Sequence, residues 1–119
     1  LPMLFRSALF AALMVAAPAI AHPKLLASTP AGGSTTASPA VVSMQFSEAL
    51  FPKLSGAALV KLGGGEPSKV ETATSFAADN RGISLKPASG LTAGQYRVDW
   101  FGVAADTHRI TGNFSFTVR

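Results

Sequence analysis

The sequence predicts a small all-β domain, an immunoglobulin-like Greek-key sandwich or barrel of about seven strands. Three observations indicate this fold class. Short runs rich in β-branched and aromatic residues alternate with turn signals, and 11 glycines and 8 prolines punctuate the 119 residues. Three of these runs alternate apolar and polar residues with a period of two. Beyond residue 21, no stretch keeps apolar residues at helical spacing for long enough to predict a helix.

Seven runs make up the predicted strands, and three of them show the alternation clearly. Each of these three places apolar side chains on one face, as expected for a strand with one buried face: residues 42–46, 96–100 and 114–118. The other four candidates are weaker: residues 24–28, 54–62, 69–75 and 83–85. Turns rich in Gly, Pro, Asn and Asp separate the runs, so we expect short connections and one domain.

Composition excludes several classes of protein. The chain is 48% hydrophobic and 13% charged, which is the opposite of a disordered sequence. It has no cysteine, so neither a disulfide scaffold nor a thiolate metal site is possible. The net charge is +4, but the basic residues are scattered singly and without interleaved aromatic residues. We therefore expect no nucleic-acid partner.

The first 21 residues are typical of a secretory signal peptide, outside the fold. Arg6 provides a positive start, and Ala8 to Ile20 is an apolar run. Ala19-Ile20-Ala21 has the small-x-small pattern that precedes a signal peptidase cut. The run is shorter than the roughly 20 apolar residues of a membrane-spanning helix. We expect export, most simply to a bacterial periplasm, and a mature domain of residues 22–119.

Cleavage after residue 21 would turn His22 into a two-donor metal ligand. Its α-amine and its ring Nδ1 can close a chelate ring on one ion, and both groups lose their protons near neutral pH. Pro23 follows and has no backbone N–H, so successive amide nitrogens cannot complete the coordination. Further ligands would have to come from elsewhere in the fold.

Asp106-Thr107-His108 is the second candidate metal-binding segment. Strand alternation would put the side chains of Asp106 and His108 on the same side of a strand or strand-end loop. Together with His22, the set would hold two imidazoles, an amine and a carboxylate, which suits Cu(II). Spacing alone does not bring His22 to the other two. An accidental terminal histidine and a local Asp–His ion pair or capped turn stay open as alternatives.

These residues resemble the CopC family of periplasmic copper-resistance proteins. The resemblance covers nearly all of the mature chain: His22-Pro23-Lys24-Leu25, Ser28-Thr29-Pro30-Ala31, Phe46-Ser47-Glu48, residues 91–100, Asp106-Thr107-His108 and Ile110-Thr111-Gly112. A terminal His-Pro combined with a late Asp-Thr-His and Ile-Thr-Gly makes a specific pattern, whereas any one of these pieces alone would be weak.

The resemblance implies a Greek-key domain with a Cu(II) site at one end. His22 would supply its amine and imidazole, His108 its imidazole, and Asp106 a carboxylate in or near the coordination sphere. Glu48 matches an acidic position of the family and would be a weak or outer ligand. By the same resemblance, the protein is no enzyme. It would sequester or carry copper as a monomer and pass it to an inner-membrane partner of the CopD type.

The chain also departs from the family pattern. Some members have a second, Cu(I)-selective site in a loop rich in Met and His, but residues 51–80 contain neither residue type. A Cu(I) site is therefore not expected. Phe101 stands where relatives often have a basic residue, and Arg109 where a proline often follows the histidine. These two changes leave the expected ligands in place.

The sequence is also compatible with two other classes of function. One is an immunoglobulin-like interaction module without a metal, in which both histidines would be incidental. The other is a copper-brace oxidase or monooxygenase, in which a terminal histidine chelate and a second histidine would hold a catalytic copper ion. The first would take up no Cu(II), and the second would turn over ascorbate and oxygen.

Overall fold

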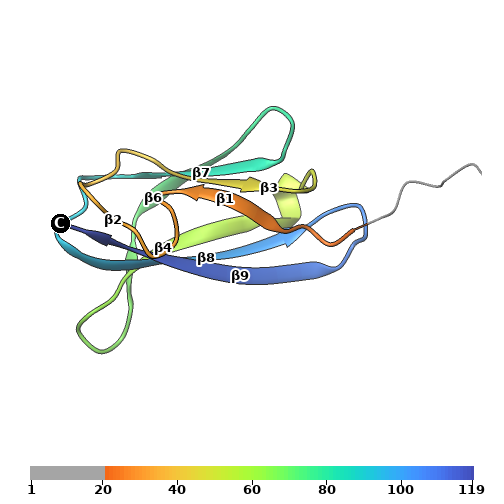
Figure 1. The fold of residues 1–119 in the computed structure, drawn as a ribbon. Helices are drawn as coiled ribbons and strands as arrows, with labels where there is room; N and C mark the ends of the chain where they lie inside the picture. The colour runs from red at the N-terminus through yellow and green to blue at the C-terminus, as the bar shows by residue number, and fades with distance from the viewer. Residues whose placement is uncertain (1–20) are drawn as a thin grey trace, which may run out of the picture.

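Two β-sheets packed face to face form the domain in the computed structural model, which describes residues 21–119 (Figure 1). One sheet has four strands in the order β1-β3-β7-β6, and the other has five in the order β2-β9-β8-β4-β5. This confirms the predicted all-β sandwich. Except for Ala21, the expected signal peptide lies outside the described residues. Within the described part, no helix is both long enough and apolar enough to cross a membrane.

The described residues form nine strands and a single 3₁₀ turn, η1. In chain order the elements are β1 (Leu25–Thr29), β2 (Thr35–Thr36), β3 (Val42–Phe46), η1 (Pro52–Leu54), β4 (Gly56–Lys61), β5 (Ser68–Val70), β6 (Thr72–Phe76), β7 (Gly82–Pro87), β8 (Gly94–Val103) and β9 (Arg109–Val118).

The expected count of seven strands was too low for two physical reasons. The predicted run 69–75 is divided at Glu71, because β5 pairs with β4 in one sheet and β6 pairs with β7 in the other. The two-residue strand β2 runs parallel to β9 and has too few residues to show any alternation. The run expected to begin at Leu54 starts two residues later as a strand, since η1 occupies its first position.

The three clearly alternating runs supply most of the core. Their inward side chains are at most 9% exposed: Val42, Met44, Phe46, Tyr96, Val98, Trp100, Phe114, Phe116 and Val118. Across the sandwich, Phe46 of the four-stranded sheet meets Trp100 of the five-stranded sheet edge to face, with ring centroids 5.0 Å apart. The indole of Trp100 also lies against Gly112, its direct partner on β9. The core therefore joins the two sheets through aromatic contacts.

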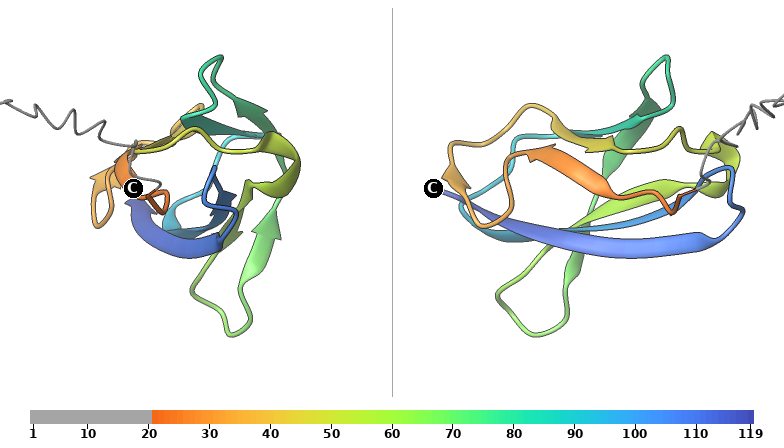
Figure 2. Two further views of the ribbon diagram at one scale, coloured as in Figure 1. Left: turned by 90° about the vertical axis from the view of Figure 1, so that its right-hand side faces the viewer. Right: turned by 45° about the vertical axis from the view of Figure 1, so that its right-hand side comes forward.

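Strands β8 and β9, each ten residues long, form an antiparallel hairpin that spans the length of the sandwich. Its connecting segment, residues 104–108, is called the β8–β9 loop below. Figure 1 shows this loop at the same end of the sandwich as η1 and the beginning of the described chain, while the C-terminus lies at the opposite end. The two rotated views in Figure 2 agree with this arrangement. Segments far apart in the sequence therefore meet at one end of the fold.

Candidate metal centre

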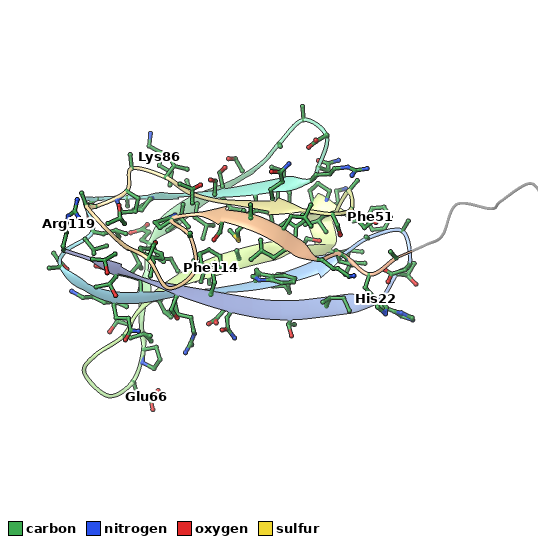
Figure 3. The ribbon with its side chains drawn as sticks, viewed as in Figure 1. His22, Phe51, Glu66, Lys86, Phe114 and Arg119 are labelled. Atoms are coloured by element: carbon green, nitrogen blue, oxygen red, sulfur yellow. The ribbon has the colours of Figure 1, made fainter. Side chains whose placement is uncertain are left out.

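His22, Asp106 and His108 come together at this end of the sandwich. Each of the three residues offers one ligand atom, and these atoms all lie within 4.8 Å of one another. Asp106 Oδ2 contacts His22 Nδ1 and lies 3.9 Å from His108 Nδ1. The two imidazole rings face each other at an angle of 44°, with centroids 5.3 Å apart. Figure 3 shows His22 at the edge of the sandwich where the described chain begins.

A tight turn in the β8–β9 loop orients the two candidate ligands Asp106 and His108. The Thr107 N–H donates to the Ala104 carbonyl oxygen at 2.9 Å, and Thr107 has a left-handed φ of 64°. The His108 N–H then points back to Asp106 Oδ1 at 3.3 Å. Both side chains face one point, as expected, but the cause is this turn and not the pleat of a strand, because β8 ends before the loop and β9 begins after it.

The N-terminal arm, defined here as residues 22–24, places His22 beside this loop. Pro23 is fully buried. A methyl group added to Gly102 would lie 3.1 Å from Leu50 and 3.7 Å from Pro23, so the two side chains share the space above that glycine. Immediately after the arm, Leu25 pairs with Phe46 at the start of β1. The arm is thus packed onto β8 just before the β8–β9 loop begins.

Burial differs sharply among the three candidate ligands. The Asp106 side chain is only 8% exposed, whereas His22 and His108 are 56% and 71% exposed. A sheltered carboxylate needs polar partners, and His22 Nδ1 and the His108 N–H provide them, while His108 Nδ1 lies farther away at 3.9 Å. The exposed rings leave the outer side of the cluster open to solvent. An ion could therefore enter and leave without rearrangement of the core.

The donor set fits a borderline transition-metal ion. Imidazole nitrogen suits copper and zinc, and a carboxylate can share the same site. Within residues 21–119, His22, Asp106 and His108 make up the one cluster of three or more His, Cys, Asp or Glu side chains with this spacing. Glu48 does not belong to this cluster. It lies in the turn after β3 and is partly buried. The structure therefore brings together three of the four side chains singled out in the sequence.

The two residues that depart from the family pattern contact each other. The Arg109 guanidinium lies over the ring of Phe101, 4.2 Å from its centroid. Such a cation–π contact keeps the positive charge of Arg109 on the outer face of the hairpin, directly after His108. The two positions are eight residues apart in the sequence, and the pairing of β8 with β9 brings them into contact.

Known proteins are similar to this chain over nearly the whole described domain. The family model described as the CopC domain matches residues 25–119. Copper resistance protein C from Pseudomonas syringae pv. tomato is 49% identical over 116 residues, which cover 93% of this chain and 92% of that protein. The crystal structure of PcoC, described as a methionine-rich copper resistance protein from Escherichia coli, superposes with a TM-score of 0.78 and 42% identity. The match covers 83% of this chain and all of PcoC.

A more distant solved structure has the same architecture. CopC from Methylosinus trichosporium OB3b is similar with a TM-score of 0.71 and 25% identity, over 82% of this chain and 93% of that protein. These likenesses extend across both sheets and are not limited to one motif.

Proposed function

The chain belongs to the CopC family, and from this membership we propose that it is a copper-binding, copper-resistance protein with one Cu(II) site at His22, Asp106 and His108. The observation that carries the proposal is the convergence of these three side chains. His22 and Asp106 are 84 positions apart in the chain, yet their side chains are in contact. Two imidazoles and a carboxylate are the kind of donors that Cu(II) accepts in proteins.

Removal of residues 1–21 would complete the donor set. The α-nitrogen of His22 would then be a free amine and could chelate the ion together with the ring. Since the histidine nitrogens and the carboxylate bind metal only when deprotonated, the affinity for Cu(II) should fall as the pH is lowered. Glu48 lies outside the cluster and would act, if at all, from the outer side of the site.

Binding and release, without catalytic turnover, would be the whole mechanism. The nitrogen donors hold the ion, the sheltered carboxylate offsets part of its charge, and the exposed rings give an acceptor access to it. The signal-peptide pattern of residues 1–21 supports a periplasmic location. In that compartment the monomeric mature protein would sequester copper or carry it to an inner-membrane acceptor of the CopD type.

A second site for Cu(I) is not part of this proposal. PcoC is described as methionine rich, whereas this chain has 3 methionines in all and only Met44 beyond residue 21. Met44 is 3% exposed and belongs to the core. Its thioether therefore does not reach solvent as a soft ligand, which supports a single site of nitrogen and oxygen donors.

The test is a titration of the mature protein, its N-terminus verified by mass spectrometry, with Cu(II). We expect one tightly bound ion per chain and an electron paramagnetic resonance spectrum with nitrogen hyperfine structure. Absence of Cu(II) uptake would contradict the proposal and favour the interaction module. Oxidised polysaccharide formed with ascorbate and oxygen would instead favour the copper-brace monooxygenase.

A further inference from the structure

Ser47 holds the N-terminal arm through two hydrogen bonds. The Lys24 N–H donates to Ser47 Oγ at 2.9 Å, and the Ser47 N–H donates to the Lys24 carbonyl oxygen at 2.9 Å. These bonds extend the pairing of β1 with β3 by one step beyond Leu25 and Phe46. At this step the serine hydroxyl takes the place of a backbone acceptor.

Arg81, in the turn between β6 and β7, holds the backbone at Ser47. Arg81 Nη1 donates to the Ser47 carbonyl oxygen at 3.0 Å. The neighbouring Phe46 N–H donates to the Arg81 carbonyl oxygen at 2.7 Å. Arg81 is itself held by its backbone N–H, which donates to Asp79 Oδ1 at 3.0 Å. Ser47 is therefore a fixed point, tied to the turn between β6 and β7, to which the arm attaches.

The arm has little freedom left once it is attached at this point. Pro23 is buried, and its ring restricts its own φ and the conformation of the residue before it. With Pro23 packed over Gly102 and Lys24 bonded to Ser47, the direction in which His22 leaves the sandwich is set. Chain ends are ordinarily poorly ordered unless they are tied down in this way.

We propose that Ser47 is a positioning residue for the metal centre: its hydroxyl latches the N-terminal arm so that His22 faces Asp106 and His108 before the metal arrives. This inference rests on the proposed function, because it concerns the affinity of the same site. A site that is ordered in advance loses less conformational freedom when its ligand binds, and it binds more tightly for that reason. Ser47 itself does not touch the metal.

Ser47→Ala in the mature protein removes the acceptor of the Lys24 N–H and leaves every proposed ligand in place. We expect the affinity for Cu(II), measured by competition with a chelator, to fall about three- to tenfold, the factor that one hydrogen bond of ordinary net strength supplies. Ser47→Thr keeps the hydroxyl and should retain most of the affinity. Ser84→Ala is the matched control, since Ser84 is partly exposed on β7 of the same sheet.

Amide hydrogen exchange in the metal-free protein separates positioning from a general loss of stability. In Ser47→Ala the Lys24 amide should lose its protection, while the His108 amide should exchange as in the wild type; Ser47→Thr should keep the Lys24 amide protected. If the Lys24 and His108 amides lose protection from exchange to the same extent, or if neither amide loses it, the latch is overturned.

The copper titration keeps the two hypotheses apart. If the wild type takes up no Cu(II), the proposed function itself is wrong. If the wild type binds tightly and Ser47→Ala binds equally tightly while its Lys24 amide exchanges freely, only the positioning role is overturned.

Discussion

The N-terminal arm brings His22 to the proposed copper site from the beginning of the described domain, whereas the β8–β9 loop brings Asp106 and His108 from inside one hairpin. The loop is shaped by its own hydrogen bonds, from Thr107 to Ala104 and from His108 to Asp106. The arm makes no such turn. It is held by contacts with other segments, through burial of Pro23 and the hydrogen bonds to Ser47.

Under the proposed function, this difference would separate the completion of the two halves in time. The β8–β9 loop needs only its own hydrogen bonds, whether or not residues 1–21 are attached. The arm gains its amine donor only when the residues before His22 are removed. By this argument a precursor that still carries residues 1–21 would have a formed loop but an incomplete site, and tight copper binding would begin after export.

The largest effect is expected from a mature chain that retains Ala21 before His22. The His22 α-nitrogen then becomes part of an amide, and the chelate with the imidazole is lost. We expect the affinity for Cu(II) to fall by more than about a hundredfold, because even outer partners of a metal ligand are worth about 10–100-fold. Competition with a chelator measures this.

The matched control for the retained residue is an extra residue after Arg119, at the opposite end of the sandwich (Figure 1). It should leave the affinity unchanged. If the chain with Ala21 binds Cu(II) as tightly as the mature chain, the α-amine is not a ligand, and the arm contributes no more than a side chain.

A change in the common scaffold should lower stability and spare both halves of the site. A methyl group on Gly112 would lie 2.4 Å from the nearest indole atom of Trp100, closer than any real contact. We expect Gly112→Ala to reduce the free energy of unfolding by about 1–3 kcal/mol, the usual cost of overpacking a core. Thermal and urea unfolding measure this, and Cu(II) affinity of the folded protein should change little.

Gly90→Ala is the control, because a methyl group at Gly90 meets no atom within 4 Å. If Gly112→Ala lowers the free energy of Cu(II) binding by as much as it lowers the free energy of unfolding, the hairpin and its loop do not behave as separable parts.

The role of charge within the loop half can be tested with Asp106→Asn. The amide oxygen of asparagine can still accept the hydrogen bond from the His108 N–H, so the turn should persist while the negative charge is lost. We expect the Cu(II) affinity to fall at least about tenfold, because even outer partners of metal ligands are worth about 10–100-fold. Glu66→Gln, in the exposed connection between β4 and β5, is the matched control. Unchanged affinity in Asp106→Asn would show that its carboxylate is not needed at the site.

Glu48→Gln examines the remaining acidic candidate. Because Glu48 is outside the ligand cluster, we expect its removal to change the Cu(II) affinity by no more than about threefold. The titration used for Asp106→Asn applies here too. A loss as large as that of Asp106→Asn would make Glu48 a direct ligand and would require the turn after β3 to move toward the β8–β9 loop.

The buried faces of β3, β8 and β9 could be predicted from the sequence, because apolar and polar residues alternate along a strand that buries one face. Strand β2 could not, since its two residues are a strand only through their pairing with β9, and neither could the change of sheet at Glu71. At the candidate site, His22, Asp106 and His108 stood out by residue type. Their meeting was implied by the family resemblance and could not be derived from spacing. The proposed role of Ser47 cannot be predicted from the sequence, since it depends on a hydrogen bond between residues 23 positions apart.

A small gain in stability is expected from relieving the backbone of the β8–β9 loop at Thr107. A β-branched residue is disfavoured at the left-handed φ of 64°, whereas asparagine adopts this region readily, as Asn80 does here at φ 58°. Thr107→Asn should therefore raise the free energy of unfolding by about 0.5–1 kcal/mol, part of the roughly 1–2 kcal/mol that the left-handed conformation costs an ordinary residue, and leave Cu(II) affinity unchanged. Thr111→Asn, on extended β9, should not stabilise the protein. If Thr107→Asn is destabilising, or if it weakens copper binding, the threonine itself is needed to aim Asp106 and His108, and the loop half depends on a side-chain contact much as the arm depends on Ser47.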